Sequence, residues 1–242
     1  MMRLVQGDVG SGKTVVAAVA CLKAIQAGYQ SALMAPTEIL AEQHYQSFSN
    51  WFEPLGINVV WLSGKTKGKS RDHVLHLMAS GQAKMIIGTH ALFQKDVNFM
   101  NLAIAVIDEQ HRFGVHQRLS LREKGMNMMP HQLIMTATPI PRSLAMTAYA
   151  DLDYSVIDEL PPGRTEIKTA VLSDDKRNEV IESVKKSAKK GNQIYWVCTL
   201  IEESEAIQCQ AAEDTAVLLG ELLPDLKVAL VHGRMNANDK QL

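Results

Sequence analysis

The sequence predicts an α/β fold in which a doubly wound parallel sheet is covered by helices on both faces. Two observations predict this class: short apolar runs alternate with longer segments of helical spacing, and a glycine-rich loop separates the first run from the first such segment. Apolar strands that alternate with helices are typical of parallel sheets. Ligands bind beyond the carboxyl ends of the strands in such sheets, so we expect the functional residues directly after them.

Six apolar runs in the first part of the chain are the expected strands, at residues 4–6, 31–35, 59–62, 85–88, 103–107 and 133–136. Residues 15–27 and 39–52 have the spacing of amphipathic helices. The alternation breaks at residues 158–165, DELPPGRT. Two prolines there remove backbone donors and the following glycine permits a positive φ, which is typical of a linker.

After this break the alternation continues for only part of a domain. Strands are expected at residues 167–172, 193–198 and 228–231, with helices at 174–190 and 202–223. About three strands are too few for a complete doubly wound domain. We therefore predict a complete first domain at residues 1–158, a linker at 159–165 and a partial second domain at 166–242, in a piece of a longer protein.

The composition is that of an ordinary globular protein, with 46% apolar and 21% charged residues in 242. No apolar run approaches the ~18 residues that cross a bilayer, and Asp8 and Lys13 interrupt any signal-peptide core. Three widely spaced cysteines fit a reducing compartment and exclude a disulfide framework. We expect a cytoplasmic protein with no membrane partner.

The net charge of −1 conceals an asymmetry between the two parts of the chain. Residues 1–150 hold 14 lysines and arginines against nine acids, whereas residues 151–242 hold 11 against 17. Such asymmetry indicates two units with different partners, although charged runs are often only solvated surface.

The strongest motif is a complete match to G-x4-G-K-T, directly after a predicted strand and before a predicted helix. Its residues are Gly7, Asp8, Val9, Gly10, Ser11, Gly12, Lys13 and Thr14. The backbone amides of such a loop cradle phosphates, its lysine binds the β- and γ-phosphates, and its threonine hydroxyl binds Mg²⁺. A chance glycine-rich turn is the alternative, which the strand and helix on either side disfavour.

A second motif is the acidic pair Asp108 and Glu109, which follows an apolar run. Asp108 would bind Mg²⁺, and Glu109 would orient the attacking water as a general base. Adjacent acids also occur at helix starts, where they only favour the helix dipole. With a phosphate loop upstream, the water-orienting acid favours a nucleoside triphosphatase over a small-molecule kinase.

A basic loop follows the third predicted strand, with four cations between Lys65 and Arg71. Such a loop can follow a phosphate backbone through a salt-dependent electrostatic attraction. A solvated surface loop is the alternative, and the residues alone do not decide between them.

With these motifs the chain resembles the motor core of superfamily 2 helicases with a DEQH box, and among them the RecG family of branched-DNA helicases. The resemblance covers essentially the whole chain and depends most on DEQHRFGVHQR and TATPIPR. Transcription–repair coupling translocases are the nearest alternative, but their counterpart segments typically read DEEHRFG. The resemblance implies one complete RecA-like P-loop domain and part of a second. It also implies ATP and Mg²⁺ as cofactors, branched or forked DNA as partner, and a monomeric full-length parent protein that serves recombination and repair.

The resemblance also carries roles to individual positions. Contacts with the nucleic-acid backbone are implied for Pro36, Thr37, Gly88, Thr89 and His90, with Lys65 in the basic loop as a further candidate. Thr37 would also suit a helix N-cap, and the two roles are compatible. Coupling of hydrolysis to DNA movement is implied for Thr136, Ala137 and Thr138, and a link from the γ-phosphate to them for Gln110 and His111.

The family also uses an arginine supplied across the interdomain cleft from a motif late in the second domain. The sequence stops before that motif, and it lacks the family's adenine-recognition segment and junction-binding wedge domain. A nucleotide-binding module without turnover is therefore the alternative function for the chain as it stands.

Overall fold

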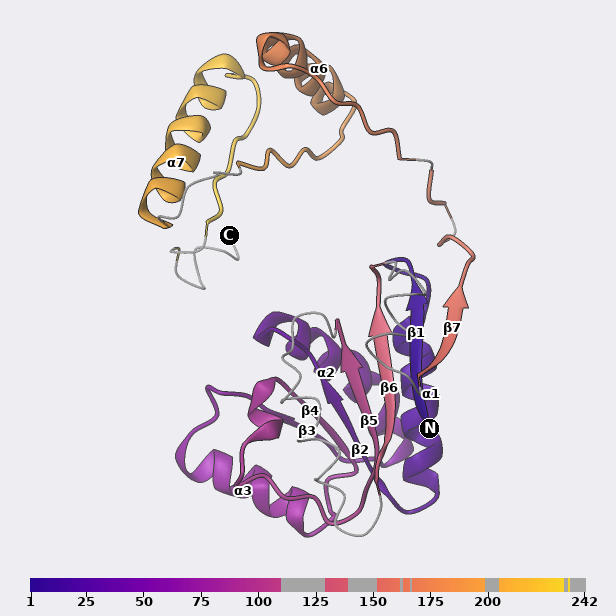
Figure 1. The fold of residues 1–242 in the computed structure, drawn as a ribbon. Coiled ribbons are helices and arrows are strands. Elements are labelled where there is room, and N and C mark those ends of the chain that lie inside the picture. The colour runs from indigo at the N-terminus through magenta and orange to yellow at the C-terminus, as the bar shows by residue number, and fades with distance from the viewer. Residues whose placement is uncertain are drawn as a thin grey trace. The chain divides into compact units, whose positions relative to one another are not determined.

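A sheet of seven parallel strands is the main feature of the first part of the chain (Figure 1). The structure is a computed structural model, and it describes residues 1–109, 129–138, 152–161, 163–165, 167–198, 205–232 and 235. The chain divides into two units, Met1–Thr165 and Glu166–Leu242, and the sheet belongs to the first.

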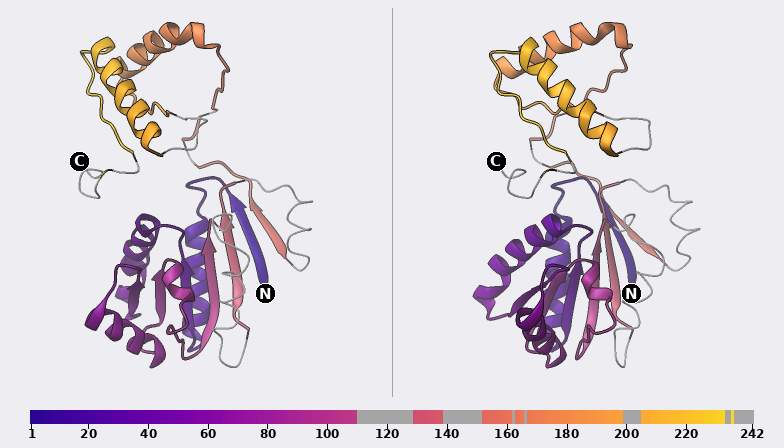
Figure 2. Two further views of the ribbon diagram at one scale, coloured as in Figure 1. Left: turned by 60° about the vertical axis from the view of Figure 1, so that its left-hand side comes forward. Right: turned by 90° about the vertical axis from the view of Figure 1, so that its left-hand side faces the viewer.

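The strand order is β3-β4-β2-β5-β6-β1-β7, and every neighbouring pair is parallel. The strands are β1 (Met2–Gly7), β2 (Gln30–Met34), β3 (Val59–Leu62), β4 (Met85–Gly88), β5 (Leu102–Asp108), β6 (His131–Thr136) and β7 (Asp153–Ile157). Among the described residues of this unit, the helices are α1 (Lys13–Gln26), α2 (Glu38–Phe52) and α3 (Gly68–Ala79), with short 3-10 turns at Glu53–Leu55 and His90–Phe93. Figure 2 shows the sheet and its helices from two further sides.

Alternate residues of the strands enter two separate cores because successive side chains point to opposite faces of a sheet. On β2, Leu33 belongs to the core that includes buried residues of α1 and α2. Its neighbours Ala32 and Met34 belong to the core that includes Met78 of α3. The central strands are therefore apolar on both faces, as the sequence pattern predicts.

All six strands predicted in the first part of the chain are confirmed, as are helices at 15–27 and 39–52, with small differences at their ends. The sequence pattern did not reveal β7, which pairs with β1 at the edge of the sheet. The sequence of β7, DYSVI, lacks the continuous apolar run that marks the central strands, and its side chains are only partly buried.

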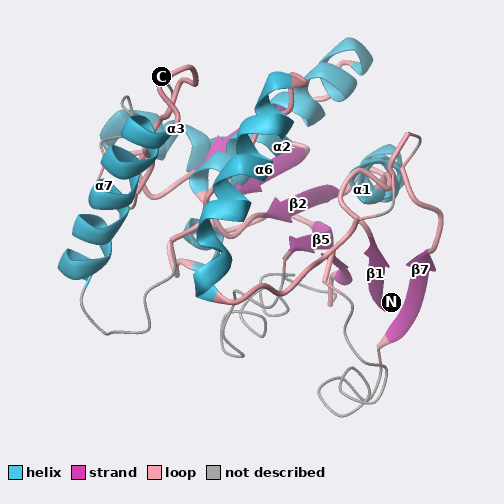
Figure 3. Cartoon of the chain, turned by 90° about the horizontal axis from the view of Figure 1, so that it is seen from above, coloured by secondary structure: helices cyan, strands magenta, loops and turns pink. Residues whose placement is uncertain are grey.

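The second unit contains a 3-10 turn at Asp174–Lys176 and two helices, α6 (Arg177–Lys189) and α7 (Glu205–Leu222), where helices are predicted. A small core joins Ile181 of α6 to Leu219 and Leu223. The prediction of strands at 167–172, 193–198 and 228–231 is wrong, because these described residues form loops (Figure 3). A strand requires a hydrogen-bonded neighbour, and several apolar side chains of these segments stay exposed instead, Val171 at 97%.

No helix among the described residues is long and apolar enough to span a bilayer.

Burial predicts different reactivity for two cysteines. Cys21 is fully buried on α1, and this burial raises the pKa of its thiol from 9.0 to about 12, whereas Cys198 is exposed. Because the thiolate is the reactive form, iodoacetamide at pH 8 should alkylate Cys198 and leave Cys21 unmodified until denaturant is added. Peptide mass spectrometry measures both sites, and alkylation of Cys21 at the rate of Cys198 in the native protein would contradict the packing of α1.

Candidate functional site

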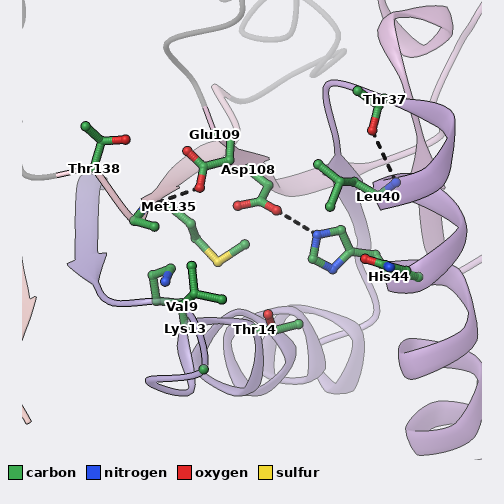
Figure 4. Close-up of a pocket in the computed structure, with 13 residues that line it drawn as sticks. Val9, Lys13, Thr14, Thr37, Leu40, His44, Asp108, Glu109, Met135 and Thr138 are labelled. Atoms are coloured by element: carbon green, nitrogen blue, oxygen red, sulfur yellow. Dashed lines mark hydrogen bonds and ion pairs between the residues drawn. The ribbon is translucent and has the colours of Figure 1, made fainter. Parts of the chain in front are cut away.

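A cavity of about 580 Å³ lies at the carboxyl edge of the sheet, between the glycine-rich loop, α2 and the ends of β5 and β6 (Figure 4). The register places these segments together, because Gln6 of β1 pairs with Thr136 of β6, and Asp108 of β5 pairs with Met135. The residues that line the cavity are Val9, Gly10, Lys13, Thr14, Thr37, Leu40, Gln43, His44, Asp108, Glu109, Met135, Ala137 and Thr138.

The glycine-rich loop turns directly from β1 into α1. Gly10 and Gly12 have φ values of +84° and +91°, a conformation that favours glycine. Gly12 is the N-cap of α1, and no side chain caps the helix or places an acid in its first turn. The first amides of α1 are therefore available to an anion, as a phosphate site requires.

Lys13 curls back into this loop. Its Nζ atom donates hydrogen bonds to the carbonyl oxygens of Gly7 and Asp8, both at 2.7 Å. Thr14, the next residue, lines the same cavity, and Figure 4 shows both residues across the cavity from Asp108 and Glu109.

Glu109 joins the acidic pair to the segment after β6. Its carboxylate accepts hydrogen bonds from the Thr136 hydroxyl at 3.4 Å and from the Ala137 amide at 3.3 Å, while its own amide donates to the Met135 carbonyl oxygen at 3.0 Å. The Thr138 amide in turn donates to the Thr136 hydroxyl at 3.1 Å. Glu109 also has a φ of +48°, which is uncommon for a residue with a side chain and often marks a functional site.

His44 of α2 is a site residue that the sequence reasoning missed. Its Nε2 atom lies 2.7 Å from Oδ2 of Asp108, and the two side chains are only 11% and 13% exposed. The available signal was a polar residue on the apolar face of a helix, three residues after the buried Ala41 and four before the buried Phe48.

The segments for which DNA contacts are predicted meet at the neighbouring part of the same edge, because Gly88 pairs with both Met34 and Leu62. Thr37 caps α2, since its hydroxyl oxygen accepts a hydrogen bond from the Leu40 amide at 3.3 Å. Glu38 accepts hydrogen bonds from the Thr89 hydroxyl at 3.3 Å and the Gly64 amide at 3.4 Å.

These residues differ in their access to a ligand. Thr89 is 1% exposed and its hydroxyl is used within the protein, and Gly88 is buried where a side chain would clash with the Leu62 carbonyl oxygen. His90 and Lys65 are exposed, and Pro36 is half-buried. Two other predicted site residues, Gln110 and His111, lie outside the described residues.

A second missed residue, Arg164, contacts the glycine-rich loop from the segment predicted as a linker. Its Nη1 atom lies 2.7 Å from Oδ2 of Asp8 and donates a longer hydrogen bond of 3.3 Å to the Val9 carbonyl oxygen. Pro161 of the same segment packs beside Gly10, 3.4 Å from where a Cβ atom would lie. Residues far apart in the sequence therefore support one face of the loop.

The donor set of the cavity fits Mg²⁺. Thr14 and Asp108 supply hydroxyl and carboxylate oxygens, which Mg²⁺ prefers, and His44 occupies only one of the two carboxylate oxygens of Asp108. The described residues contain no cluster of three or more metal-ligating side chains. An ion at this site would be held by one or two protein oxygens together with substrate phosphates.

The fold and the site together define a class of protein. A glycine-rich loop with its lysine at a helix start, and an acidic pair at the end of a nearby strand of one parallel sheet, are the parts of a P-loop nucleoside triphosphatase domain. The chain belongs to the DEAD/DEAH box helicase family, because the sequence model of that family matches residues 2–147.

Within this family the predicted resemblance to RecG is confirmed. The chain is 64% identical over its whole length to the ATP-dependent DNA helicase RecG of Escherichia coli K12, and 48% identical over 99% of its length to RecG of Aquifex aeolicus. The chain spans about a third of the length of these relatives, 35% and 30%.

Solved structures agree with the fold class. A structure of RecG bound to a three-way DNA junction has a TM-score of 0.72 and 43% identity, and the similarity covers 91% of this chain and 28% of that one. The DUF1998 helicase MrfA has a TM-score of 0.65 at 20% identity over 92% of this chain and 37% of that one, which shows the fold alone.

The Arg164 contact predicts a modest contribution to nucleotide affinity. Arg164→Ala would leave the Asp8 carboxylate unneutralised beside the phosphate site. Because partly exposed ion pairs contribute at most about 1 kcal/mol, we expect affinity for a fluorescent ADP analogue to fall by about two- to fivefold.

The double variant Asp8→Asn/Arg164→Ala should recover most of that affinity, because no uncompensated charge remains. Arg71→Ala, which breaks the remote ion pair with Asp96 at 2.8 Å, is the matched control and should leave the affinity unchanged. Equal affinity of Arg164→Ala and the unmodified chain would show that the contact does not act on the loop.

Proposed function

We propose that this chain is the motor segment of an ATP-dependent DNA helicase that acts on branched DNA, with Mg²⁺ as its metal. The observation that carries the proposal is the Glu109 carboxylate, which lies in the nucleotide cavity and is hydrogen-bonded to Thr136 and Ala137. One side chain then belongs both to the hydrolytic site and to the segment expected to couple hydrolysis to movement.

Nucleotide binding would begin with an exchange of partners at Lys13. Its ammonium group is held by two loop carbonyl oxygens, and the β- and γ-phosphates would replace them with stronger, charge-assisted hydrogen bonds. The first amides of α1 would bind the same phosphates. Thr14 and Asp108 would hold Mg²⁺, which when bound neutralises phosphate charge during transfer.

Hydrolysis would depend on Glu109 as the general base that orients the attacking water. The hydrogen bonds from Thr136 and Ala137 hold its carboxylate at a fixed place in the cavity. A change in the charge or partner of Glu109 would then reach the segment after β6 without an intervening side chain.

The DNA backbone would lie along the adjacent part of the sheet edge, where the ends of β2, β3 and β4 meet. The exposed His90 and Lys65 are the side chains there with direct access to phosphates. The buried Thr89 would not contact the DNA itself but would position Glu38 through their hydrogen bond. Branched DNA is the proposed substrate because RecG relatives match the whole chain and one solved RecG structure is bound to a three-way junction.

Substitutions in the cavity should separate nucleotide binding from turnover. Glu109→Gln should lower DNA-stimulated ATP hydrolysis by about 10²- to 10⁴-fold, because it removes the general base, and it should retain nucleotide binding. Lys13→Ala should lose nucleotide binding itself. Phosphate release and fluorescent-nucleotide titration, with and without forked DNA, measure the two effects.

Glu53→Gln, in the exposed turn after α2, is the matched acid control and should hydrolyse ATP at the unmodified rate. A chain that binds nucleotide but shows no turnover with forked DNA would be a nucleotide-binding module, and the motor proposal for this segment would fail.

DNA binding should depend on salt through Lys65. Each neutralised phosphate adds about 0.9 to the slope of log K against log salt concentration, so Lys65→Ala should lower that slope by about one. Lys23→Ala is the control, because Lys23 lies in the last turn of α1, away from its phosphate-binding start. Equal slopes for the Lys65 variant and the unmodified chain would remove this loop from the DNA interface.

A further inference from the structure

We propose that His44 is a positioning residue that fixes the Asp108 carboxylate and makes its metal affinity depend on the DNA-contacting end of α2. The proposal rests on the proposed function, because it assigns Asp108 to the metal and the α2 start to DNA. It goes beyond that function by naming a residue, and a route, through which the two sites affect each other.

The contact between His44 and Asp108 has the geometry of a strong hydrogen bond. Nε2 and Oδ2 are 2.7 Å apart, and both side chains are largely removed from solvent. A hydrogen bond to one oxygen of a carboxylate fixes the direction of the other. Groups that hold a metal ligand in this way typically change metal affinity by about 10- to 100-fold when they are removed.

His44 also connects Asp108 to a separate element of the fold. Asp108 ends β5, whereas His44 lies in the second turn of α2, so their contact joins two segments with no backbone hydrogen bonds between them. In Figure 4 the imidazole points from α2 toward the Asp108 carboxylate, and a dashed line joins the two side chains. A displacement of α2 would therefore move or break this contact.

The start of the same helix carries the proposed DNA-side contacts. Glu38, its first residue, accepts hydrogen bonds from Thr89 and from Gly64, and Thr37 caps it. Glu38 and His44 are six residues apart, about 9 Å along a rigid helix. A shift of the loops around Glu38 would thus be transmitted to His44 by the helix itself.

The hydrogen bonding around Glu38 is incomplete in this conformation. Its Oε2 atom is buried and has no partner among the described residues. A buried carboxylate oxygen without a partner is costly. Movement of the Thr89 and Gly64 loops when they meet a phosphate backbone would let this oxygen gain a donor, which gives DNA a physical means of shifting α2.

The first experiment measures metal affinity directly. Mn²⁺ serves as the probe in the presence of saturating ADP, and the free ion is quantified by electron paramagnetic resonance. We expect His44→Ala to raise the dissociation constant for Mn²⁺ by about tenfold or more. His44→Gln should stay closer to the unmodified chain, because the glutamine amide can place a donor near the position of Nε2.

His44→Asn is too short to reach Asp108 and should behave like His44→Ala, which keeps the test available if the alanine variant does not fold. His76→Ala, on the exposed surface of α3, is the matched histidine control. Unchanged Mn²⁺ affinity in folded His44→Ala or His44→Asn would overturn the positioning role, since a histidine that only packs would leave this affinity unaltered.

The second experiment tests the coupling. Forked DNA should shift the Mn²⁺ affinity of the unmodified chain, and the shift should disappear in His44→Ala and in Glu38→Gln. A shift that survives in both variants would overturn the route through α2. Failure of the proposed function would give a different result from failure of this inference. If the unmodified chain does not bind DNA, the DNA titration itself will show it, and the Mn²⁺ measurement of the first experiment still stands.

Discussion

The register of the parallel strands is the constraint on which the site depends. Pairing of Gln6 with Thr136 and of Asp108 with Met135 ends three strands at one level, so the glycine-rich loop, the acidic pair and the Thr136 segment open into one cavity. Pairing of Gly88 with Met34 and Leu62 does the same for the loops around Glu38. Because side chains alternate between faces, a slip of one residue would turn strand-end side chains such as Asp108 to the opposite face of the sheet.

Helix α2 lies where these two groups of loops meet, and it makes contacts with both of them. Its first residue, Glu38, holds the loops after β3 and β4, and His44 in its second turn reaches Asp108 at the end of β5. Glu109, the next residue, holds the segment after β6. The loops assigned to DNA are therefore connected to the acidic pair through Glu38, helix α2 and His44, and the covalent link from Asp108 to Glu109 continues this connection to the segment assigned to coupling.

The sequence is sufficient for those parts of the fold and site that short segments encode. Continuous apolar runs predict the buried strands, and the glycine-rich loop with its lysine is one covalent unit. The half-exposed β7 lacks an apolar run, and the roles of His44 and Arg164 arise only when segments distant in the chain come together. The prediction of strands after residue 166 is wrong for a related reason. An apolar pattern shows that a segment is able to form a strand, but a strand also requires a neighbouring strand to pair with.

Each charged group of the cavity has a protein partner that a ligand would have to replace or share. Lys13 is held by two loop carbonyl oxygens, Asp108 by His44, and Glu109 by Thr136 and Ala137. Charges in a half-buried cavity are costly without partners, so these contacts stabilise the site before any ligand binds. The same contacts make binding an exchange of partners, and because the partners of Asp108 and Glu109 lie on α2 and after β6, an exchange at the acidic pair would affect both of these segments. In the proposed motor, a site assembled in this way from the ends of separate strands would convert a local change of charge into movement of the segments around it.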